Sequence, residues 1–294
     1  MDLTPPGEGA EHRLPQVVRR PYFHTENLPT LQRELYTVAW ICALPIEMAA
    51  AQAVLDERHR PLPTHTDDTN TYILGTIQGH NVVIACLPMD QYGIINAATV
   101  VTNLKRTFTA IRVGLIVGIG GGVPSKVDVR LGDVVVGTRV MQTDLGKIVA
   151  GEQLERISIH KIPHQLLGIA VSALRAKHEL EPSQIPSILL RKLEGHGYSR
   201  PNLSDRLFLP TYHHEAAVTS CDDCDFSKLV PRITRKSNDP VIHYGAIASG
   251  SQLIKNSVFR DEVARQLNVI CFEMEAAGIM ILSRRRRIRH DQRL

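Results

Sequence analysis

The chain has 294 residues, of which 43% are hydrophobic and 22% are charged, a balance typical of a globular protein with a sizeable core. No apolar run approaches the roughly 20 residues that a membrane helix needs, and the first residues lack the apolar stretch of a secretory signal. Five cysteines without a regular framework favour a reducing compartment. The sequence therefore excludes a membrane protein and predicts a soluble, cytoplasmic one.

The formal net charge of +4 is unevenly distributed along the chain. Residues 284–294 hold six arginines and one aspartate, a charge of +5, so the rest of the chain carries about −1. A basic run without interleaved aromatic residues is more typical of a solvated tail than of a nucleic-acid site. We therefore expect no nucleic-acid partner.

Three segments are expected. Residues 1–35 are rich in Pro, Arg, Glu and His without a sustained period, which predicts a disordered leader. Residues 36–283 are regularly patterned and predict one folded domain, and residues 284–294 form the basic tail. Within the domain, residues 181–240 hold several prolines, which predict an insertion or a long loop region.

Strand and helix patterns alternate through the domain, which predicts an α/β fold, a three-layer α/β/α sandwich with a central β-sheet. A predicted hairpin at 71–87 makes this sheet mixed. The apolar runs at 37–44 and 113–117 are typical of strands buried on both faces. The patterns predict, in chain order, a strand at 37–44, a helix at 46–57, a hairpin at 71–87, a helix at 94–108, strands at 113–117 and 132–142, a helix at 164–180, a strand at 241–249, a helix at 258–267, a strand at 268–274 and a helix at 275–282.

Three features that could carry chemistry fall where predicted strands end, the place where α/β sheets usually bind ligands. The first is a glycine run, Gly118 to Gly122. A dinucleotide fingerprint that started at Gly118 would need a glycine at Val123, so that motif is absent. The run either lets a ligand approach the backbone closely or forms a tight turn.

The other two features are acidic, and each allows two interpretations. Glu273 and Glu275 alternate along a predicted strand, so both could face one side and accept hydrogen bonds from the vicinal hydroxyls of a ribose. Glu47 follows the first strand and could be a general base that activates water. Alternatively, all three acids compensate the dipole in the first turn of a helix.

Together these features resemble a known family. The strings ICALPIEMAA, LIVGIGGGVP, RLGDVVVG, HYGAIASGSQLIKNS and CFEMEAAGIM are similar in order and spacing to the purine/uridine phosphorylase and methylthioadenosine/adenosylhomocysteine nucleosidase superfamily. They look most like its fungal branch, in which this domain often precedes NACHT, ankyrin or TPR regions. The resemblance covers about residues 36–283 and implies a nucleoside phosphorylase-like fold, a small-molecule nucleoside as ligand, no metal or organic cofactor, and a homo-oligomer.

The resemblance also implies roles for single residues. Glu47 would orient the attacking water, and Glu275 would bind the ribose hydroxyls while Met274 packs on the sugar. The other implied contacts are Gly120 and Gly121 around the sugar and nucleophile, Leu253 and Ile254 beside the base, and Glu273 next to the ribose-binding acid.

One departure from the family concerns the reaction type. Phosphorylases of this superfamily bind phosphate through arginines, commonly soon after the first strand, whereas residues 44–48 here read LPIEM. A glutamate at this place would repel phosphate and could activate water. We therefore predict cleavage of the N-glycosidic bond of a purine-type nucleoside by hydrolysis rather than by phosphorolysis.

A second departure concerns the last residues. In the family a further strand follows the predicted helix at 275–282 and ends in an aspartate that protonates the purine. Here residues 283–294 read SRRRRIRHDQRL, in which Asp291 has no matching setting. The resemblance thus implies that the general-acid segment is missing. Three explanations are open: the sequence is truncated, the domain is an inactive nucleoside-binding sensor module of a larger protein, or a partner chain completes the fold.

Cys221 and Cys224, with His213 and His214, form the one cluster that suggests metal ligands. Structural zinc sites usually show two well-spaced pairs, and adjacent histidines project in different directions. We therefore predict a polar loop with free thiols and no metal site.

Overall fold

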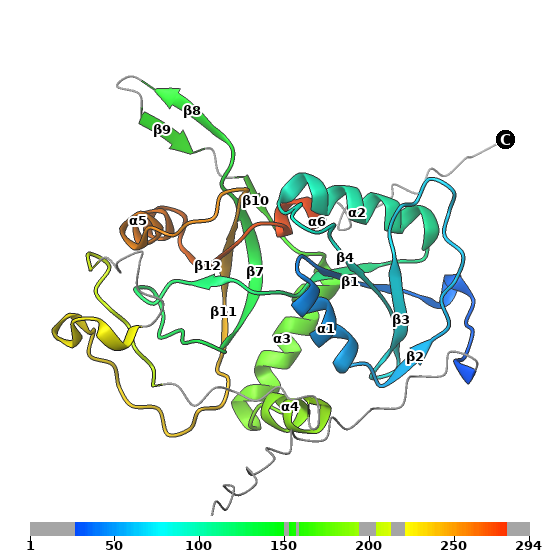
Figure 1. Ribbon diagram of the computed structural model, residues 1–294, viewed down its shortest axis with the longest axis horizontal. Coiled ribbons are helices and arrows are strands. Elements are labelled where there is room, and N and C mark those ends of the chain that lie inside the picture. The colour runs from blue at the N-terminus through cyan, green and yellow to red at the C-terminus, as the bar shows by residue number, and fades with distance from the viewer. Residues whose placement is uncertain (1–26, 150–152, 157–158, 194–203, 213–220, 281–294) are drawn as a thin grey trace, which may run out of the picture.

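The computed structural model describes residues 27–149, 153–156, 159–193, 204–212 and 221–280. The predicted α/β, nucleoside phosphorylase-like class is confirmed, with helices packed against mixed sheets (Figure 1). Hydrogen bonding divides most strands into two five-stranded sheets, and β8 (Gly146–Val149) and β9 (Gln153–Arg156) form a separate ribbon.

The first sheet is centred on the strand β1, which pairs in parallel with a neighbour on each side. Ala39 and Ile41 of β1 pack toward the helix α2 (Ile94–Thr107), whereas Trp40 and Cys42 pack toward α1 (Pro45–Ala53). This part of the molecule therefore has the three layers that the alternating patterns predict. Its strands, in spatial order, are β2 (Glu57–His59), β3 (Tyr72–Ile77), β4 (His80–Cys86), β1 (Val38–Cys42) and β5 (Val113–Ile116).

The predicted hairpin is confirmed as the antiparallel pair β3 and β4. Its turn consists of only Gln78 and Gly79, because His80 already pairs with Ile77. Both turn residues have positive φ, 47° and 77°. Such angles match the right-handed twist of the strands they join.

The strand β5 differs from its prediction. Its apolar run predicts burial on both faces, yet every residue of β5 is only half-buried. Among the described strands, β5 is an edge strand that pairs with β1 alone, so part of its surface stays open. An apolar run shows that a segment is hydrophobic, but it does not determine how many neighbouring strands pair with it.

The second sheet is centred on β11, which pairs in parallel with β7 and β12. Its outer face packs on the helix α5 (Ser257–Leu267), through Ala246 and Ala248 of β11 and Ala264 of the helix. The strands, in spatial order, are β10 (Ile159–Lys161), β7 (Val134–Gln142), β11 (Ile242–Ser249), β12 (Val269–Glu273) and β6 (Gly121–Gly122).

The short helix α6 (Ala276–Ile279) joins the two sheets. Its buried Ala276 and Ala277 pack with Val140 of β7 on one side and with Ile94 and Ile116 on the other. Figure 1 shows α6 between the two halves of the molecule, beside α2. The carboxyl ends of β1 and β5 are thereby brought toward those of β7, β11 and β12.

The region predicted as an insertion, 181–240, holds a helix that the sequence patterns missed, α4 (Ile185–Leu193). Lys192 of α4 binds Asp56 at 2.6 Å. The predicted helix at 164–180 is confirmed as α3 (Gln165–Leu180), but none of its residues is buried. Arg175 and His178 of α3 contact Tyr244 of β11.

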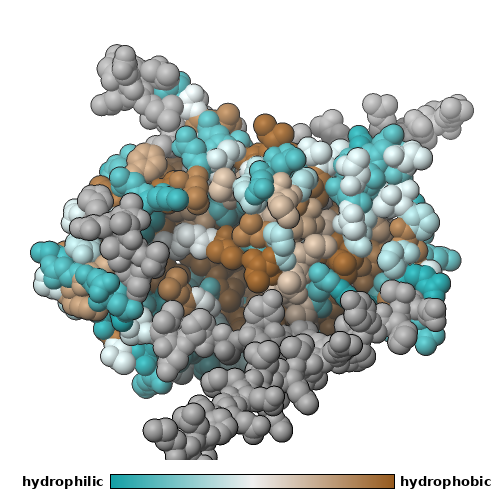
Figure 2. Space-filling view, in the orientation of Figure 1, coloured by the Kyte–Doolittle hydropathy of each residue, from teal (hydrophilic) through white to brown (hydrophobic). Residues whose placement is uncertain are grey.

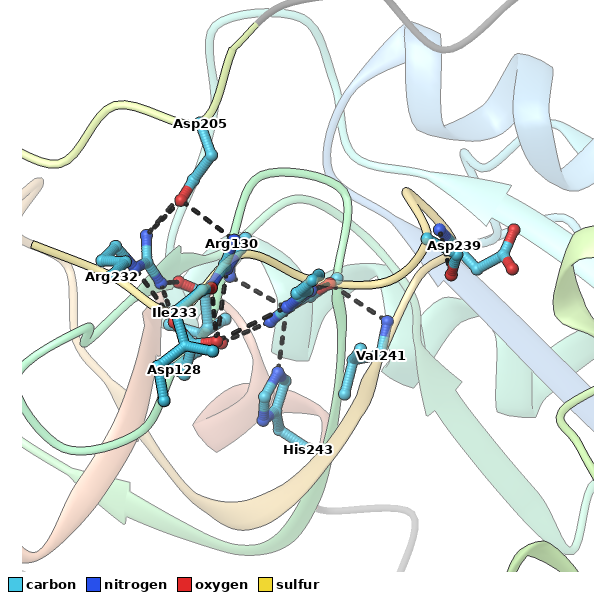
Figure 3. A network of polar contacts seen from close by, with 12 residues as sticks. Asp128, Arg130, Asp205, Arg232, Ile233, Asp239, Val241 and His243 are labelled. Atoms are coloured by element: carbon cyan, nitrogen blue, oxygen red, sulfur yellow. Dashed lines mark hydrogen bonds and ion pairs between the residues drawn. The ribbon is translucent and has the colours of Figure 1, made fainter.

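An ion-pair network ties Asp205, Arg232 and Arg235 of this region to residues just before β7 of the second sheet (Figure 3). Asp133, whose side chain is fully buried, accepts hydrogen bonds from both terminal nitrogens of Arg235 at 2.7 and 2.8 Å. The Val241 amide and His243 add two more, at 3.0 and 2.9 Å. Burial acts to raise the pKa of Asp133, but the hydrogen bonds from Arg235, His243 and the amides of Val241 and Arg130 outweigh it and hold the pKa well below the usual range.

Replacing Asp133 with asparagine is expected to destabilise the fold by about 1–3 kcal/mol, because it replaces the buried charged acceptor of the hydrogen bonds from Arg235, His243 and the Val241 amide with a neutral group. The depressed pKa adds a pH dependence to this effect. The stabilisation is present above the unfolded-state pKa of about 3.9 and is lost as the pH falls below it. Urea unfolding at pH 7 and at about pH 3, below the unfolded-state pKa, should therefore show a difference between wild type and Asp133→Asn that shrinks toward the acid.

The control is Asp239→Asn, which changes an exposed acid in the same segment. It should leave the urea midpoint unchanged, since exposed charges contribute little. Equal midpoints for the two variants at pH 7 would show that the network does not stabilise the fold.

Two residues of the predicted leader, Pro29 and Leu31, contact the folded domain. The Pro29 carbonyl accepts a hydrogen bond from the Arg60 amide at 2.9 Å, and Leu31 packs against the hydrophobic core between β1 and α2. The predictions for residues 1–26 and for the basic tail lie outside the described residues. The same is true of the predicted loss of a general-acid segment, which stays a prediction. No helix in the described ranges is long and apolar enough to cross a membrane.

Candidate functional site

Glu47 links the ends of two strands. It stands in the first turn of α1, where its Oε2 accepts hydrogen bonds from the amides of Ala43 and Leu44 at 2.8 and 3.0 Å. Its Oε1 accepts a third, at 2.7 Å, from the amide of Ile119 in the loop after β5. The residue is only 8% exposed. Glu47 therefore caps the helix and, by the same geometry, holds its carboxylate over the glycine loop.

The glycine run fits closely around this carboxylate. A Cβ on Gly118 would lie 2.5 Å from Oε1 of Glu47, so a larger residue could not stand there unless Glu47 moved. A Cβ on Gly120 would lie 2.7 Å from Sγ of Cys271, and Gly121 pairs with Phe272 of β12. The run thus has two tasks, since Gly118 makes room for the acid while Gly120 and Gly121 bring the loop against β12.

Glu275 stands at the start of α6 and is 7% exposed. Its Oε1 accepts a hydrogen bond from the Gly93 amide at 3.0 Å, and its Oε2 accepts one from Met274 at 3.2 Å. Gly93 has a φ of 96°, a conformation that favours glycine. The residues that place Glu275 therefore come from β12 and from the loop before α2.

The two acids approach each other from distant parts of the chain. Burial raises the pKa of Glu275, the amides of Gly93 and Met274 oppose that shift, and the negative charge of Glu47 adds to it. A carboxylate affects another in this way only within a short range. The loop that donates the Ile119 amide to Glu47 also pairs, at Gly121, with Phe272, three residues before Glu275, so the backbone brings the two acids toward each other.

The alternating pattern predicts that Glu273 and Glu275 face the same side as a pair. The structure shows no such pair. The strand β12 ends at Glu273, so the alternation stops there. The Oε2 of Glu273 instead accepts hydrogen bonds from the amides of Glu275 and Ala276, at 2.9 and 2.8 Å. Its Oε1 is buried and has no hydrogen-bond partner among the described residues.

The carboxyl ends of three parallel strands surround a small, partly open hollow. Thr143 follows β7, Gly250 follows β11 and Glu273 ends β12. Ile254 also lines the hollow, whereas Leu253 is 70% exposed, so only one of these two predicted base contacts lies in it. Figure 2 shows apolar surface gathered near the middle of one face of the molecule.

The hollow adjoins the position of Glu275. Ser251, next to the lining residue Gly250, donates hydrogen bonds from its amide and hydroxyl to Asp144, at 2.9 and 3.0 Å. A Cβ on Gly93 would lie 3.3 Å from Oγ of Ser251. The loops that hold Glu275 and those that line the hollow are therefore in contact.

Sequence patterns missed three residues of this arrangement, Gly93, Asp144 and Ser251. A glycine directly before a predicted helix was a usable signal for Gly93, since such a position often needs positive φ. Asp144 and Ser251 carry no signal of this kind, because more than one hundred residues separate them.

The cysteine cluster offers no metal site in the described part of the chain, where no three possible ligands come together. Cys221 is exposed and Cys224 is half-buried, and both are free thiols. The other candidate ligands, His213 and His214, lie outside the described residues.

The chain is similar to several known proteins. It is 40% identical over 262 residues to a nucleotide-binding leucine-rich repeat (NLR)-like protein of Hyaloscypha variabilis, an alignment that covers 86% of this chain and 26% of that protein. The chain therefore spans about a quarter of the length of that relative. It is 26% identical to a 5′-methylthioadenosine/S-adenosylhomocysteine nucleosidase of Mycobacterium bovis, over 83% of this chain and 78% of that enzyme.

Solved structures support the fold. The 5′-methylthioadenosine/S-adenosylhomocysteine nucleosidase of Neisseria meningitidis, in complex with methylthio-immucillin-A, aligns with a TM-score of 0.50 and 19% identity, covering 84% of this chain and 79% of that one. The family model of the phosphorylase superfamily matches residues 37–290, which is most of the chain. The family that the sequence motifs resemble is thus confirmed, and the chain belongs to the phosphorylase superfamily.

Proposed function

We propose that this chain is a nucleosidase domain, which binds a purine-type nucleoside and hydrolyses its N-glycosidic bond. The observation that carries the proposal is that Glu47 and Glu275 are both buried and are held by segments that meet where Gly121 pairs with Phe272. The relative from Mycobacterium bovis, named as a nucleosidase, and the analogue-bound structure from Neisseria meningitidis support the substrate class. No metal or organic cofactor enters this chemistry.

Glu275 would hold the ribose. A carboxylate oxygen has two acceptor positions, and each oxygen of Glu275 uses one of them for a backbone amide. The remaining positions suit the two neighbouring hydroxyls of a ribose. Met274, whose amide binds the same carboxylate, would pack on the sugar, and Gly120 and Gly121 would line its other side.

Glu47 would act on the attacking water. Its three hydrogen-bond donors are backbone amides, and its Oε1 keeps one acceptor position free. The sugar acquires positive charge as the bond to the base breaks, so a nearby carboxylate also stabilises it. Phosphorylases of the superfamily bind phosphate through arginines near this place, whereas here a carboxylate held by backbone amides occupies it. A carboxylate repels phosphate, which favours water as the nucleophile.

The base would lie toward the hollow, in contact with Ile254, while Leu253 closes over it from the exposed side. Phe259 and Phe272 of the same hollow offer apolar surface for a purine ring. Binding of a purine would thus bury polar and apolar groups together, as in most small-molecule sites.

The direct experiment is incubation of the protein with a panel of purine nucleosides and 5′-thio nucleosides, with and without phosphate. We expect free base and free sugar, at a rate that phosphate does not change. Formation of sugar 1-phosphate would show phosphorolysis, and absence of any free base would contradict the proposed activity.

A second candidate function is a nucleoside sensor that binds without turnover. It is favoured by the relative from Hyaloscypha variabilis, an NLR-like protein of which this chain matches only a part. Calorimetry separates the two candidates, because a sensor shows nucleoside binding with no product after prolonged incubation.

Gly118→Ala tests the position of Glu47. The added Cβ would overlap Oε1 of Glu47, so the acid must move away from the sugar. Since a displacement of about 1 Å in an active site can cost about 10² in rate, we expect a loss of that order with nucleoside affinity nearly unchanged. Gly168→Ala is the matched control, because nothing lies near a Cβ at that position. Equal rates for both variants would show that Glu47 does not need its present place.

The proposal includes a homo-oligomer. Large apolar side chains stand exposed near the residues of the site, in the first turns of α1 and α2 and on the loops after β4, β5 and β11, and such groups often mark a protein interface. They are Ile46, Met89, Ile95, Ile119 and Leu253. Sedimentation at micromolar concentration should give more than one mass of the chain, and a single mass would exclude this part of the proposal.

We also propose the cytoplasm as the location. All five cysteines are free thiols, as in a reducing compartment. A fluorescent fusion to the natural protein should give a diffuse cytoplasmic signal, and a secreted fusion would contradict it.

A further inference from the structure

We propose that Glu273 is the proton donor to the leaving base, acting through its unpaired Oε1. This inference rests on the proposed function and names a third acid for the same site. It departs from the pairing of Glu273 with the sugar that the sequence predicts.

The first support is the division of tasks between the two oxygens of Glu273. Oε2 is held by the amides of Glu275 and Ala276, at 2.9 and 2.8 Å, so the carboxyl group cannot rotate freely. Oε1 is buried without a hydrogen-bond partner in the described part of the chain. Leaving a buried polar atom unpaired costs about 1–3 kcal/mol, so such an atom at a site usually has a function.

The second support is position. Glu273 lines the hollow at the ends of β7, β11 and β12, together with the apolar Ile254 and Phe272. This is the side of the site on which the base would lie. An acid here would reach the base while Glu275 holds the sugar.

The third support is the state of the other two acids. Each oxygen of Glu47 and of Glu275 already accepts at least one amide hydrogen bond, an arrangement that suits a carboxylate. Glu273 alone of the three has an oxygen on which a proton would meet no competing donor. Burial in apolar surroundings, opposed by the Glu275 and Ala276 amides and by Ser249, raises the pKa of Glu273 and favours the protonated form.

The step balances as follows. As the bond between C1′ and the base nitrogen breaks, its electron pair goes to the base, and a nitrogen of the base takes the proton from Oε1 of Glu273. Water attacks C1′ and gives its proton to Glu47. The products are neutral base and free sugar, and proton exchange with solvent returns Glu273 to its acid form and Glu47 to its carboxylate form.

The test compares two substrates in wild type and in Glu273→Gln. Glutamine keeps the size of the side chain and an oxygen for the two amides, but it has no proton to give. For a purine nucleoside, the variant should lose about 10²- to 10⁴-fold in rate. For p-nitrophenyl β-ribofuranoside, whose leaving group departs without a proton, the rate should fall less than about threefold on the same grounds.

Calorimetry with a non-hydrolysable nucleoside analogue gives a second readout. An acid role leaves the affinity of Glu273→Gln at the wild-type level, whereas a role limited to placing Glu275 lowers it. The exposed Glu262→Gln of α5 is the control, and it should match wild type with both substrates.

Equal losses on both substrates, weaker analogue binding, or a variant that cleaves the purine nucleoside at the wild-type rate would each overturn the inference. A wild type that cleaves neither substrate would instead refute the proposed function itself, so the two failures are distinguishable.

Discussion

Glu275→Ala is expected to weaken nucleoside binding by about 10²- to 10⁴-fold. The estimate follows from two hydrogen bonds between sugar hydroxyls and a charged carboxylate, at about 1.5–3 kcal/mol each. The loss should appear in calorimetry with a non-hydrolysable analogue, and kcat/KM should fall at least as much. Both candidate functions predict this result, because they share the ribose contact.

The variant must still fold for this result to have meaning. Alanine leaves the amides of Gly93 and Met274 without their acceptor, while it also removes a carboxylate whose pKa burial raises. These effects oppose each other, so thermal unfolding should change little. Glu181→Ala at the exposed end of α3 is the control for removing an acid. Normal analogue binding by Glu275→Ala would show that the ribose lies elsewhere.

Glu47→Gln is expected to lower turnover by about 10²- to 10⁴-fold and to change nucleoside affinity less than about tenfold, because a general base acts mainly in the transition state. This division between kcat and affinity separates Glu47 from Glu275. Rapid mixing of enzyme with saturating nucleoside, followed by quantification of free base, measures the turnover.

The same change should reduce stability, because the side chain of Glu47 accepts three amide hydrogen bonds. A glutamine amide group presents hydrogens where one carboxylate oxygen accepted, at a cost of about 1–3 kcal/mol. Asp56→Asn, an acid just after α1 that pairs with Lys192, controls for loss of charge nearby. Unchanged turnover in Glu47→Gln would remove this residue from the mechanism, whatever its effect on stability.

The elements of the fold were largely predictable from the sequence because hydrophobic periodicity is local. Two runs rich in β-forming residues at 71–87 predict the hairpin, and helical spacing at 94–108 predicts α2, and both are present. Packing was harder to predict. The apolar run of β5 does not indicate that this strand has one neighbour among the described strands, and α3 has a helical pattern yet buries no residue.

The candidate site divides in the same way. Glu47 and Glu275 follow strand patterns and carry recognisable motifs, so the sequence can point to them. The positions of Glu273 and Gly118 depend on where a strand ends and on a carboxylate that arrives from another loop. The contact of Asp144 with Ser251 joins residues that are 107 positions apart, so no local sequence pattern predicts it.

The central claim is that Glu47 and Glu275 face one bound nucleoside. The most direct measurement is a crystal structure of Glu47→Gln soaked with the nucleoside that the wild type binds. We predict electron density with the sugar hydroxyls on the carboxylate of Glu275, C1′ toward residue 47, and the base beside Ile254 and Glu273. A nucleoside bound away from Glu275, or with its C1′ turned away from residue 47, would contradict the account.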